Sequence, residues 1–194
     1  MRLHGLANSL HHDKRMKLMK SHTAVSQTSF LDDLDICISV DVETSGPIPS
    51  LYSLLSIGAC TLLPPRQSFY VELKPDHTAI DPHAQKIHRL DYQKLALEGI
   101  SPEKTLLQFE QWIDQLIPPN KSPLFVAFNA PFDWMFINDY FHRYLGHNPF
   151  GHKALDIKAY YLGASKFNWA ETSGSVLHAR YLEGHGLTHN ALHD

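Results

Sequence analysis

The amino-acid sequence predicts an α/β fold with a mixed β-sheet, and three observations carry this prediction. Three apolar segments with short connections come first, at about residues 35–43, 51–63 and 67–73, which indicates three antiparallel strands. Helical and strand patterns then alternate, as they do in layered α/β folds. A chain of 194 residues with 43% hydrophobic residues is large enough for one domain with its own core.

Clusters of proline and glycine end the first three segments. The first runs into Gly46-Pro47-Ile48-Pro49-Ser50, the second ends at Pro64-Pro65, and the third stops at Pro75. A later apolar run, Leu124-Phe125-Val126-Ala127-Phe128, is continuous, which is typical of a strand buried on both faces. Ala154-Leu155-Asp156-Ile157 predicts a short fifth strand that runs into a helix.

Three helices are expected around the fourth strand. Asp81-Pro82 starts one whose apolar residues extend over 83–98, and Ser101 caps a second that Pro118-Pro119 ends. A third begins near Pro131. Its apolar stripe should dock on the sheet through four side chains at helical spacing, namely Trp134, Ile137, Phe141 and Leu145.

The two ends of the chain carry weaker patterns. Residues 1–31 show no sustained periodicity and hold five basic residues against Asp13 alone. This favours a disordered basic arm, with a targeting segment as the alternative. We therefore expect the folded domain at 32–194. Residues 163–187 are rich in Gly, Ser, Thr and Asn and predict a long loop around a short helix.

The charge distribution limits how the chain can bind nucleic acid. The net charge is −3, and because the arm carries +4, residues 32–194 carry −7. A nucleic-acid-binding domain usually has a basic body. Any such role here must therefore depend on a local site where metal ions offset acidic side chains.

Cysteine and histidine usage bears on the compartment and the cofactor. Cys37 and Cys60 both fall in predicted buried strands, where reduced cysteines act as small core residues. Reduced cysteines are typical of a reducing compartment, so we expect a cytoplasmic location. The 14 histidines are scattered, with only His11-His12 adjacent, which disfavours a dedicated histidine metal site. No apolar run of the sequence is long enough to span a bilayer.

Acidic side chains are expected to gather where the strands end. Asp41 and Glu43 alternate with valines at the end of the first strand, so their side chains share one face of it. Asp133 lies on the first turn of the helix after the fourth strand. We expect it opposite the apolar stripe, pointing toward the open end of the sheet, where α/β folds bind ligands. His189 and Asp194, five residues apart near the end of the chain, can bracket one metal ion.

Four acids and one histidine suit the hydrolysis of a phosphodiester. Carboxylate oxygens without thiolates favour Mg²⁺ or Mn²⁺ over zinc, and two such ions stabilise the attacking and leaving oxygens. A histidine that binds no metal is a suitable base for the attacking water. Each residue alone has an ordinary alternative: a solvated strand end for Asp41 and Glu43, a first-turn acid for Asp133, and a surface histidine for His189.

Three motifs resemble those of the DEDDh 3'-5' exonucleases, a group that includes ribonuclease T, oligoribonuclease and the proofreading subunit of polymerases. The motifs are Asp41-Val42-Glu43-Thr44-Ser45-Gly46, Asn129-Ala130-Pro131-Phe132-Asp133 and His189-Asn190-Ala191-Leu192-His193-Asp194. The resemblance covers roughly residues 33–194. It implies an RNase H-like fold, a two-metal site on Asp41, Glu43, Asp133 and Asp194, and His189 as the general base.

Two features of the third motif depart from the family pattern. In the family its helix continues past the last acid, whereas Asp194 is the final residue here, and we therefore expect a C-terminally truncated domain. His193 stands where many relatives have an acid, and we interpret it as a residue of the helix surface.

The expected function is that of a metal-dependent 3'-5' exonuclease acting on single-stranded RNA or DNA. Thr44, Leu51 and Phe132 are candidates for contacting the terminal nucleotide, and Asp156, which resembles a structural acid of the family, is expected to cap a helix. Two alternative functions remain, a proofreading exonuclease that acts beside a polymerase and a catalytically weak nucleic-acid-binding relative. The expected partner is the 3' end of a single strand, and a homodimer or association with a polymerase stays open. An RNase H-like endonuclease is disfavoured because its chemistry needs no base such as His189.

Overall fold

The computed structural model describes residues 36–165, 167–181 and 191. The chain divides into two units, Met1–Asp33 and Leu34–Asp194, and the fold below is that of the second unit. The expected basic arm at 1–31 lies outside the described residues, and so do His189 and Asp194.

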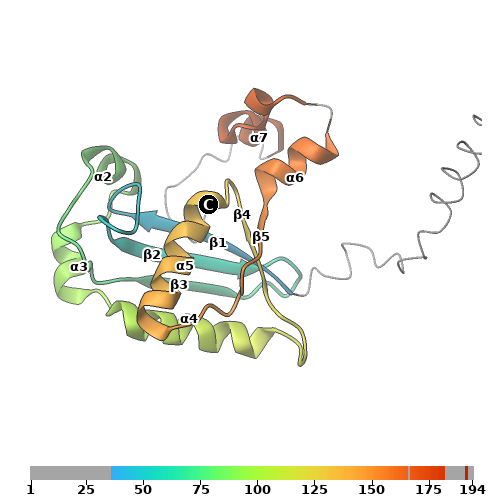
Figure 1. The fold of residues 1–194 in the computed structure, drawn as a ribbon. Coiled ribbons are helices and arrows are strands. Elements are labelled where there is room, and N and C mark those ends of the chain that lie inside the picture. The colour runs from blue at the N-terminus through green and yellow to red at the C-terminus, as the bar shows by residue number, and fades with distance from the viewer. Residues whose placement is uncertain (1–35, 166, 182–190, 192–194) are drawn as a thin grey trace, which may run out of the picture. The chain divides into compact units, whose positions relative to one another are not determined.

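Five strands form one mixed sheet in the order β3-β2-β1-β4-β5 (Figure 1). Their bounds are β1 Cys37–Thr44, β2 Leu54–Thr61, β3 Ser68–Glu72, β4 Leu124–Ala127 and β5 Ala154–Asp156. The first three strands pair antiparallel, and β4 and β5 join parallel to β1. The predicted sheet, with three antiparallel strands followed by parallel ones, is confirmed.

Helices fill the connections between and after the strands. Their bounds are α2 Pro82–His88, α3 Tyr92–Glu98, α4 Pro102–Leu116, α5 Pro131–Leu145, α6 Ile157–Ala164, the 3-10 helix η2 Trp169–Thr172 and α7 Gly174–Tyr181. Within 163–187, the segment expected to be a long loop around a short helix, the described residues hold the end of α6, η2 and α7. No helix among the described residues has the length and apolar character needed to cross a membrane.

The prediction of a single helix over 83–98 is wrong, because this segment forms two helices, α2 and α3. Arg89 adopts a left-handed conformation, φ 55°, and its N–H bonds to the carbonyl of Gln85, which ends α2. Asp91 then starts α3 by accepting hydrogen bonds from the N–H groups of Gln93 and Lys94. Apolar spacing continues across this break, so periodicity alone does not reveal it.

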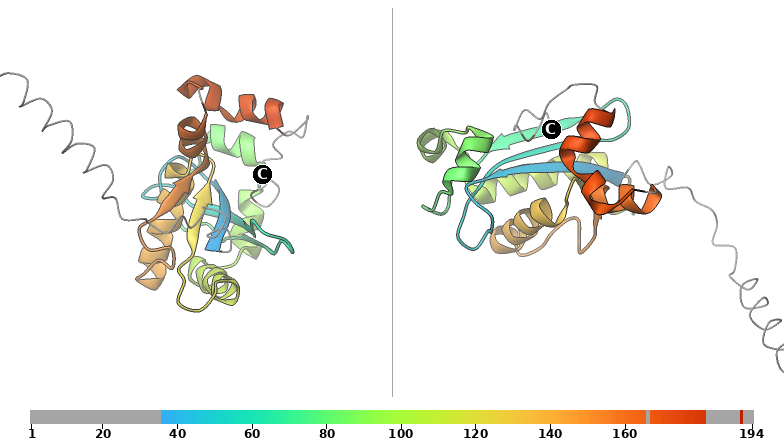
Figure 2. Two further views of the ribbon diagram at one scale, coloured as in Figure 1. Left: turned by 90° about the vertical axis from the view of Figure 1, so that its right-hand side faces the viewer. Right: turned by 90° about the horizontal axis from the view of Figure 1, so that it is seen from above.

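The core lies between one face of the sheet and the pair α4 and α5, which pack against each other (Figures 1 and 2). On β1 the residues Ile38, Val40 and Val42 are buried, whereas Ser39, Asp41 and Glu43 between and after them are only half-buried. Phe109 of α4 is fully buried at the centre of a cluster of aromatic rings contributed by Phe69, Trp112, Phe141 and Phe150.

The predicted docking face of α5 needs a correction. Trp134 and Leu145 are only partly buried. The buried side chains of the helix are Asp133, Phe136, Ile137, Tyr140 and Phe141. Asp133 therefore lies on the face that α5 buries, not opposite it. Pattern reasoning missed this face because it includes two polar groups, whose hydrogen bonds to distant residues allow their burial.

Candidate active site

The carboxyl end of β1 extends beyond its parallel neighbour. Pairing with β4 runs only from Cys37 opposite Leu124 to Ser39 opposite Val126, and β4 ends at Ala127. Within the described part of the chain, the pairing between β1 and β4 thus ends at Ser39. The chain turns sharply after β4, and the first turn of α5 lies where a longer β4 would continue.

Asp133 connects this first turn of α5 to β1. Its Oδ1 accepts a hydrogen bond from the backbone N–H of Val42, with 3.2 Å between nitrogen and oxygen. Val42 stands between Asp41 and Glu43 in the strand, and the side chains of these two acids share its half-buried face. The hydrogen bond thus holds the third acid of the predicted site beside the other two.

The electrostatics of Asp133 agree with the placement of the three acids in one site. Asp133 is only 4% exposed. The pKa of its carboxyl is raised to about 8, mainly by burial and further by the negative charges of Asp41 and, less strongly, Glu43. Backbone N–H donors, including that of Val42, lower the pKa but do not cancel the rise. A nearby cation would reverse the repulsion.

The turn that carries Asp133 is held by an acid on the next strand. Asn129 adopts a left-handed conformation, φ 60°, which asparagine tolerates better than most residues. Asp156, the N-cap of α6, accepts a hydrogen bond from Lys158 N at 3.0 Å, which confirms its predicted role as a helix cap. The same oxygen also accepts from Asn129 N at 3.0 Å and from Ala130 N at 3.4 Å.

The three candidate substrate contacts lie in different surroundings. Thr44 is only 5% exposed, and its hydroxyl donates a hydrogen bond to the carbonyl of Gly46, 2.8 Å away. Leu51 is 56% exposed at the tip of the loop after β1. Phe132 is partly buried, with its ring centroid 5.5 Å from that of Phe136. Of the three, Leu51 is the side chain with a wide solvent-facing surface.

A network that the sequence did not suggest anchors the loop after β1. Arg143 of α5 donates to the carbonyl of Pro49 at 3.0 Å and to the carboxylate of Asp76 at 2.7 Å. Asp76 also accepts from the hydroxyl of Tyr140, which in turn accepts from Leu54 N at 2.7 Å. These residues are far apart in the sequence and follow no motif, so their pairing becomes visible only in the fold.

The sequence of this chain is similar to that of a known protein. No protein-family model matches the chain. The chain is 47% identical over 164 residues to the 3'-5' DNA exonuclease Cap18 of Escherichia coli, and the match covers 84% of this chain and 87% of that protein. The chain belongs to this 3'-5' exonuclease family. The predicted resemblance to 3'-5' exonucleases is thereby confirmed.

Solved structures of exonuclease I share the fold of this family member. One superposes with a TM-score of 0.60 over 80% of this chain and 37% of that chain, at 19% identity. The zinc-bound form of the E. coli exonuclease I complex with single-stranded DNA superposes with a TM-score of 0.51. The match covers 68% of this chain and 31% of that chain, at 18% identity. The exonuclease domain described here thus spans about a third of those chains. The predicted RNase H-like fold is confirmed.

The donor set of this exonuclease fits hard divalent cations. Asp41, Glu43 and Asp133 offer carboxylate oxygens, the ligands that Mg²⁺ and Mn²⁺ prefer. Among the described residues no group of three or more His, Cys, Asp or Glu is arranged to hold a metal ion by itself. The raised pKa of Asp133 nevertheless marks the place where positive charge would lower the energy of the site most directly.

Asp156→Ala is expected to lower both the stability and the activity of the exonuclease. The variant lacks the carboxylate that accepts from the N–H groups of Asn129, Ala130 and Lys158. The loss of these hydrogen bonds should lower the free energy of unfolding by roughly 1–3 kcal/mol. Because two of these groups belong to the turn before Asp133, kcat should also fall, about tenfold or more. Urea unfolding and steady-state kinetics measure the two effects.

Asp91→Ala provides a matched control, because Asp91 caps α3 by accepting from Gln93 N and Lys94 N. It should lower stability by a comparable amount and leave kcat unchanged. Equal loss of kcat in both variants would mean that Asp156 acts only through general stability.

Proposed function

We propose that this chain is a metal-dependent exonuclease that removes 5'-mononucleotides from the 3' end of single-stranded DNA. The observation that carries the proposal is the joint placement of Asp41, Glu43 and Asp133 at the end of β1. The name of the E. coli relative supports DNA as the substrate, and the exonuclease I complex supports a single strand.

In this proposal the acids hold two divalent cations, Mg²⁺ or Mn²⁺, with Asp194 as the fourth carboxylate ligand. When bound, the cations supply positive charge to the attacking and the leaving oxygen of an in-line displacement. Asp133 would give up its proton on loading, since its charge then faces cations as well as Asp41 and Glu43. The backbone N–H of Val42 would keep its carboxylate oriented.

The reaction breaks the P–O3' bond of the last phosphodiester. His189 accepts a proton from a water molecule as the water oxygen attacks phosphorus. The products are a 5'-mononucleotide and a strand shortened by one residue with a new 3'-hydroxyl. Thr44, Leu51 and Phe132 are the proposed contacts of the departing nucleotide, with Leu51 offering its exposed side chain to the base.

A substrate panel tests the proposal. The full chain is incubated with Mg²⁺ or Mn²⁺ and 5'-labelled single-stranded DNA, single-stranded RNA, blunt duplex DNA, or a duplex with a mismatched 3' end. A ladder shortened from the 3' end of single-stranded DNA is expected, and EDTA should abolish it. Internal cuts would contradict the proposal. Preference for the mismatched duplex would favour the proofreading alternative, and binding without cleavage a catalytically weak relative.

His189→Ala is expected to lower kcat by about 10²–10⁴-fold, the usual contribution of a general base. Affinity for Mn²⁺ should change little, because His189 is not a proposed ligand. Kinetics on single-stranded DNA and calorimetric titration with Mn²⁺ separate the two effects. His193→Ala is the neighbouring control and should remain active. Full activity of His189→Ala would show that the assigned base is wrong.

A further inference from the structure

Apolar and aromatic side chains of α6, η2 and α7 remain at the surface. None of the residues of α6 or α7 is buried. Trp169 of η2 is 55% exposed and Tyr181 of α7 is 60% exposed. The other two tryptophans, Trp112 and Trp134, pack against aromatic neighbours and are partly buried. Burial of an aromatic ring is favourable, so this surface would gain from contact with a flat, apolar ligand group.

Cations lie over two rings of this surface, those of Trp169 and Phe167. Lys158 Nζ stands 4.0 Å from the centroid of the Trp169 ring. The guanidinium of Arg180 stands 4.1 Å from the centroid of Phe167, which stacks on Tyr161 at 5.7 Å with 8° between the planes. Positive charges and aromatic rings thus lie together in one cluster. We call it the aromatic platform, and it consists of Lys158, Tyr161, Phe167, Trp169, Arg180 and Tyr181.

The charge of this region differs from that of the whole chain. Residues 152–181 contain Lys153, Lys158, Lys166 and Arg180 against Asp156 and Glu171, whereas the chain has a net charge of −3. Both acids are engaged in local hydrogen bonds, Asp156 with three backbone N–H groups and Glu171 with Asn168 N in the capping box of η2. The sequence of this region thus carries an excess of two positive charges, which favours contact with a polyanion.

The platform adjoins the turn that carries Asp133. Helix α6 begins at Ile157, directly after Asp156, whose carboxylate holds that turn. At the start of α7, a Cβ on Gly174 would lie 3.7 Å from the ring of Phe128, the residue that follows β4. Figures 1 and 2 show α6 and α7 together beyond the ends of β4 and β5.

We propose that the aromatic platform binds single-stranded DNA upstream of the nucleotide being removed. The inference rests on the proposed function, because the 3' end in the active site leaves only the 5' part of the strand to reach α6 and α7. Bases stack on the exposed rings, and phosphates pair with Lys158 and Arg180 beside them, whatever the base sequence. Trp169, 55% exposed with the Lys158 ammonium over its ring, should contribute most.

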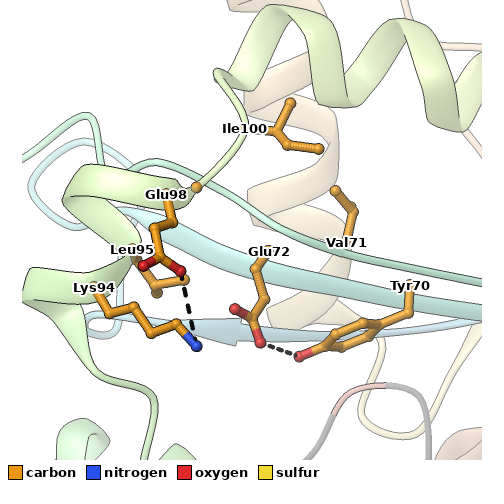
Figure 3. A pocket seen from close by; sticks show the side chains of 8 residues that line it. Tyr70, Val71, Glu72, Lys94, Leu95, Glu98 and Ile100 are labelled. Atoms are coloured by element: carbon orange, nitrogen blue, oxygen red, sulfur yellow. Dashed lines mark hydrogen bonds and ion pairs between the residues drawn. The ribbon is translucent and has the colours of Figure 1, made fainter.

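A hollow at the opposite edge of the sheet lacks such a combination of exposed rings and cations. It lies between β3 and α3, and Figure 3 shows the side chains that line it. Its one lysine, Lys94, lies 3.9 Å from the carboxylate of Glu98. Glu72 accepts a hydrogen bond from the Tyr70 hydroxyl on the same wall. Two acids against one lysine do not favour a polyanion, so the strand is assigned to the platform and not to this hollow.

Intrinsic fluorescence tests the platform without any cleavage. The full chain in EDTA is titrated with a long oligothymidylate, and quenching of tryptophan emission is expected as bases stack on Trp169. Trp169→Phe should bind with similar affinity and lose most of the quenching. Trp169→Ala should bind about fivefold or more weakly, the effect of losing one base–aromatic stack. Leu97→Ala, which changes a highly exposed side chain of α3, should match the unmodified chain.

Two further measurements separate the platform from the active site. Lys158→Gln should reduce the magnitude of the slope of log K against log salt concentration by roughly 0.7, the value for the loss of one phosphate contact with a single strand. In Mg²⁺, Trp169→Ala should raise KM for a long strand and leave the cleavage of a dinucleotide unchanged. Unchanged affinity and quenching in Trp169→Ala would overturn the platform, even if the chain degrades DNA. Normal binding with no cleavage of any strand would instead overturn the proposed function and leave the platform standing.

Discussion

Asp41→Asn is expected to lower kcat on single-stranded DNA by at least about 10³-fold, with little change in the free energy of unfolding. The removed charge is worth several kcal/mol of transition-state stabilisation when it positions a catalytic cation. The substitution keeps the size of a half-buried side chain and relieves its repulsion with Asp133. Initial rates measure the first effect and urea unfolding the second.

Ser39→Ala is the matched control for this variant. Ser39 lies two residues earlier on the same half-buried face of β1. It should leave kcat within about twofold of the unmodified chain, since no catalytic role is assigned to it. An Asp41→Asn protein that retains a tenth or more of the activity would remove Asp41 from the metal site.

The metal-free protein is expected to lose stability as the pH rises from about 5 to 8. The pKa of Asp133 is about 8 in the folded chain, against an ordinary value of 3.8. Over this range the unfolded chain has released the proton and the folded chain still holds it. Stability therefore falls with rising pH, by at most about 1.4 kcal/mol per pH unit, and is lowest above the folded pKa.

Asp133→Asn should remove most of this slope, because an amide holds no proton to release. Urea unfolding in EDTA at several pH values compares the variant with the unmodified chain and with Asp114→Asn, which changes an exposed acid of α4. Asp133→Asn should be the more stable protein near pH 8 and should not hydrolyse DNA. An identical slope in all three proteins would contradict the assigned pKa of Asp133.

Divalent metal ions should stabilise the fold most at high pH, where Asp133 of the metal-free protein destabilises it. Cations bind the ionised carboxyl, so the stabilisation by Mg²⁺ or Mn²⁺ should grow with pH in the unmodified chain. In Asp133→Asn the same metal concentration should stabilise less. Acids collected for catalysis would thus make the metal-free fold less stable, a trade-off often seen at functional sites.

Local patterns predicted the parts of the fold that depend on local chemistry. Alternation along β1 placed Asp41 and Glu43 on one face, and the capping role of Asp156 followed from its place at the end of β5. The motif resemblance identified Asp133 as their partner. His189 and Asp194 lie outside the described residues, so their roles stay predictions from the third motif.

Features that depend on long-range contacts could not be predicted in this way. Apolar spacing runs through the left-handed break at Arg89 between α2 and α3. The buried face of α5 includes Asp133 and Tyr140, whose hydrogen-bond partners lie on β1, on β2 and in the loop after β3. The second function of Asp156, holding the turn at Asn129, likewise joins segments 27 residues apart.

The identity of the first small product is the measurement that tests the central claim most directly. Single-stranded DNA is incubated with the full chain and Mg²⁺ in water enriched in ¹⁸O, and the released molecules are analysed by mass spectrometry. Hydrolysis from the 3' end predicts the 3'-terminal nucleotide as a 5'-monophosphate carrying one ¹⁸O, before any other product. Release of internal fragments, of the 5'-terminal nucleotide, or of 3'-monophosphates would contradict the account.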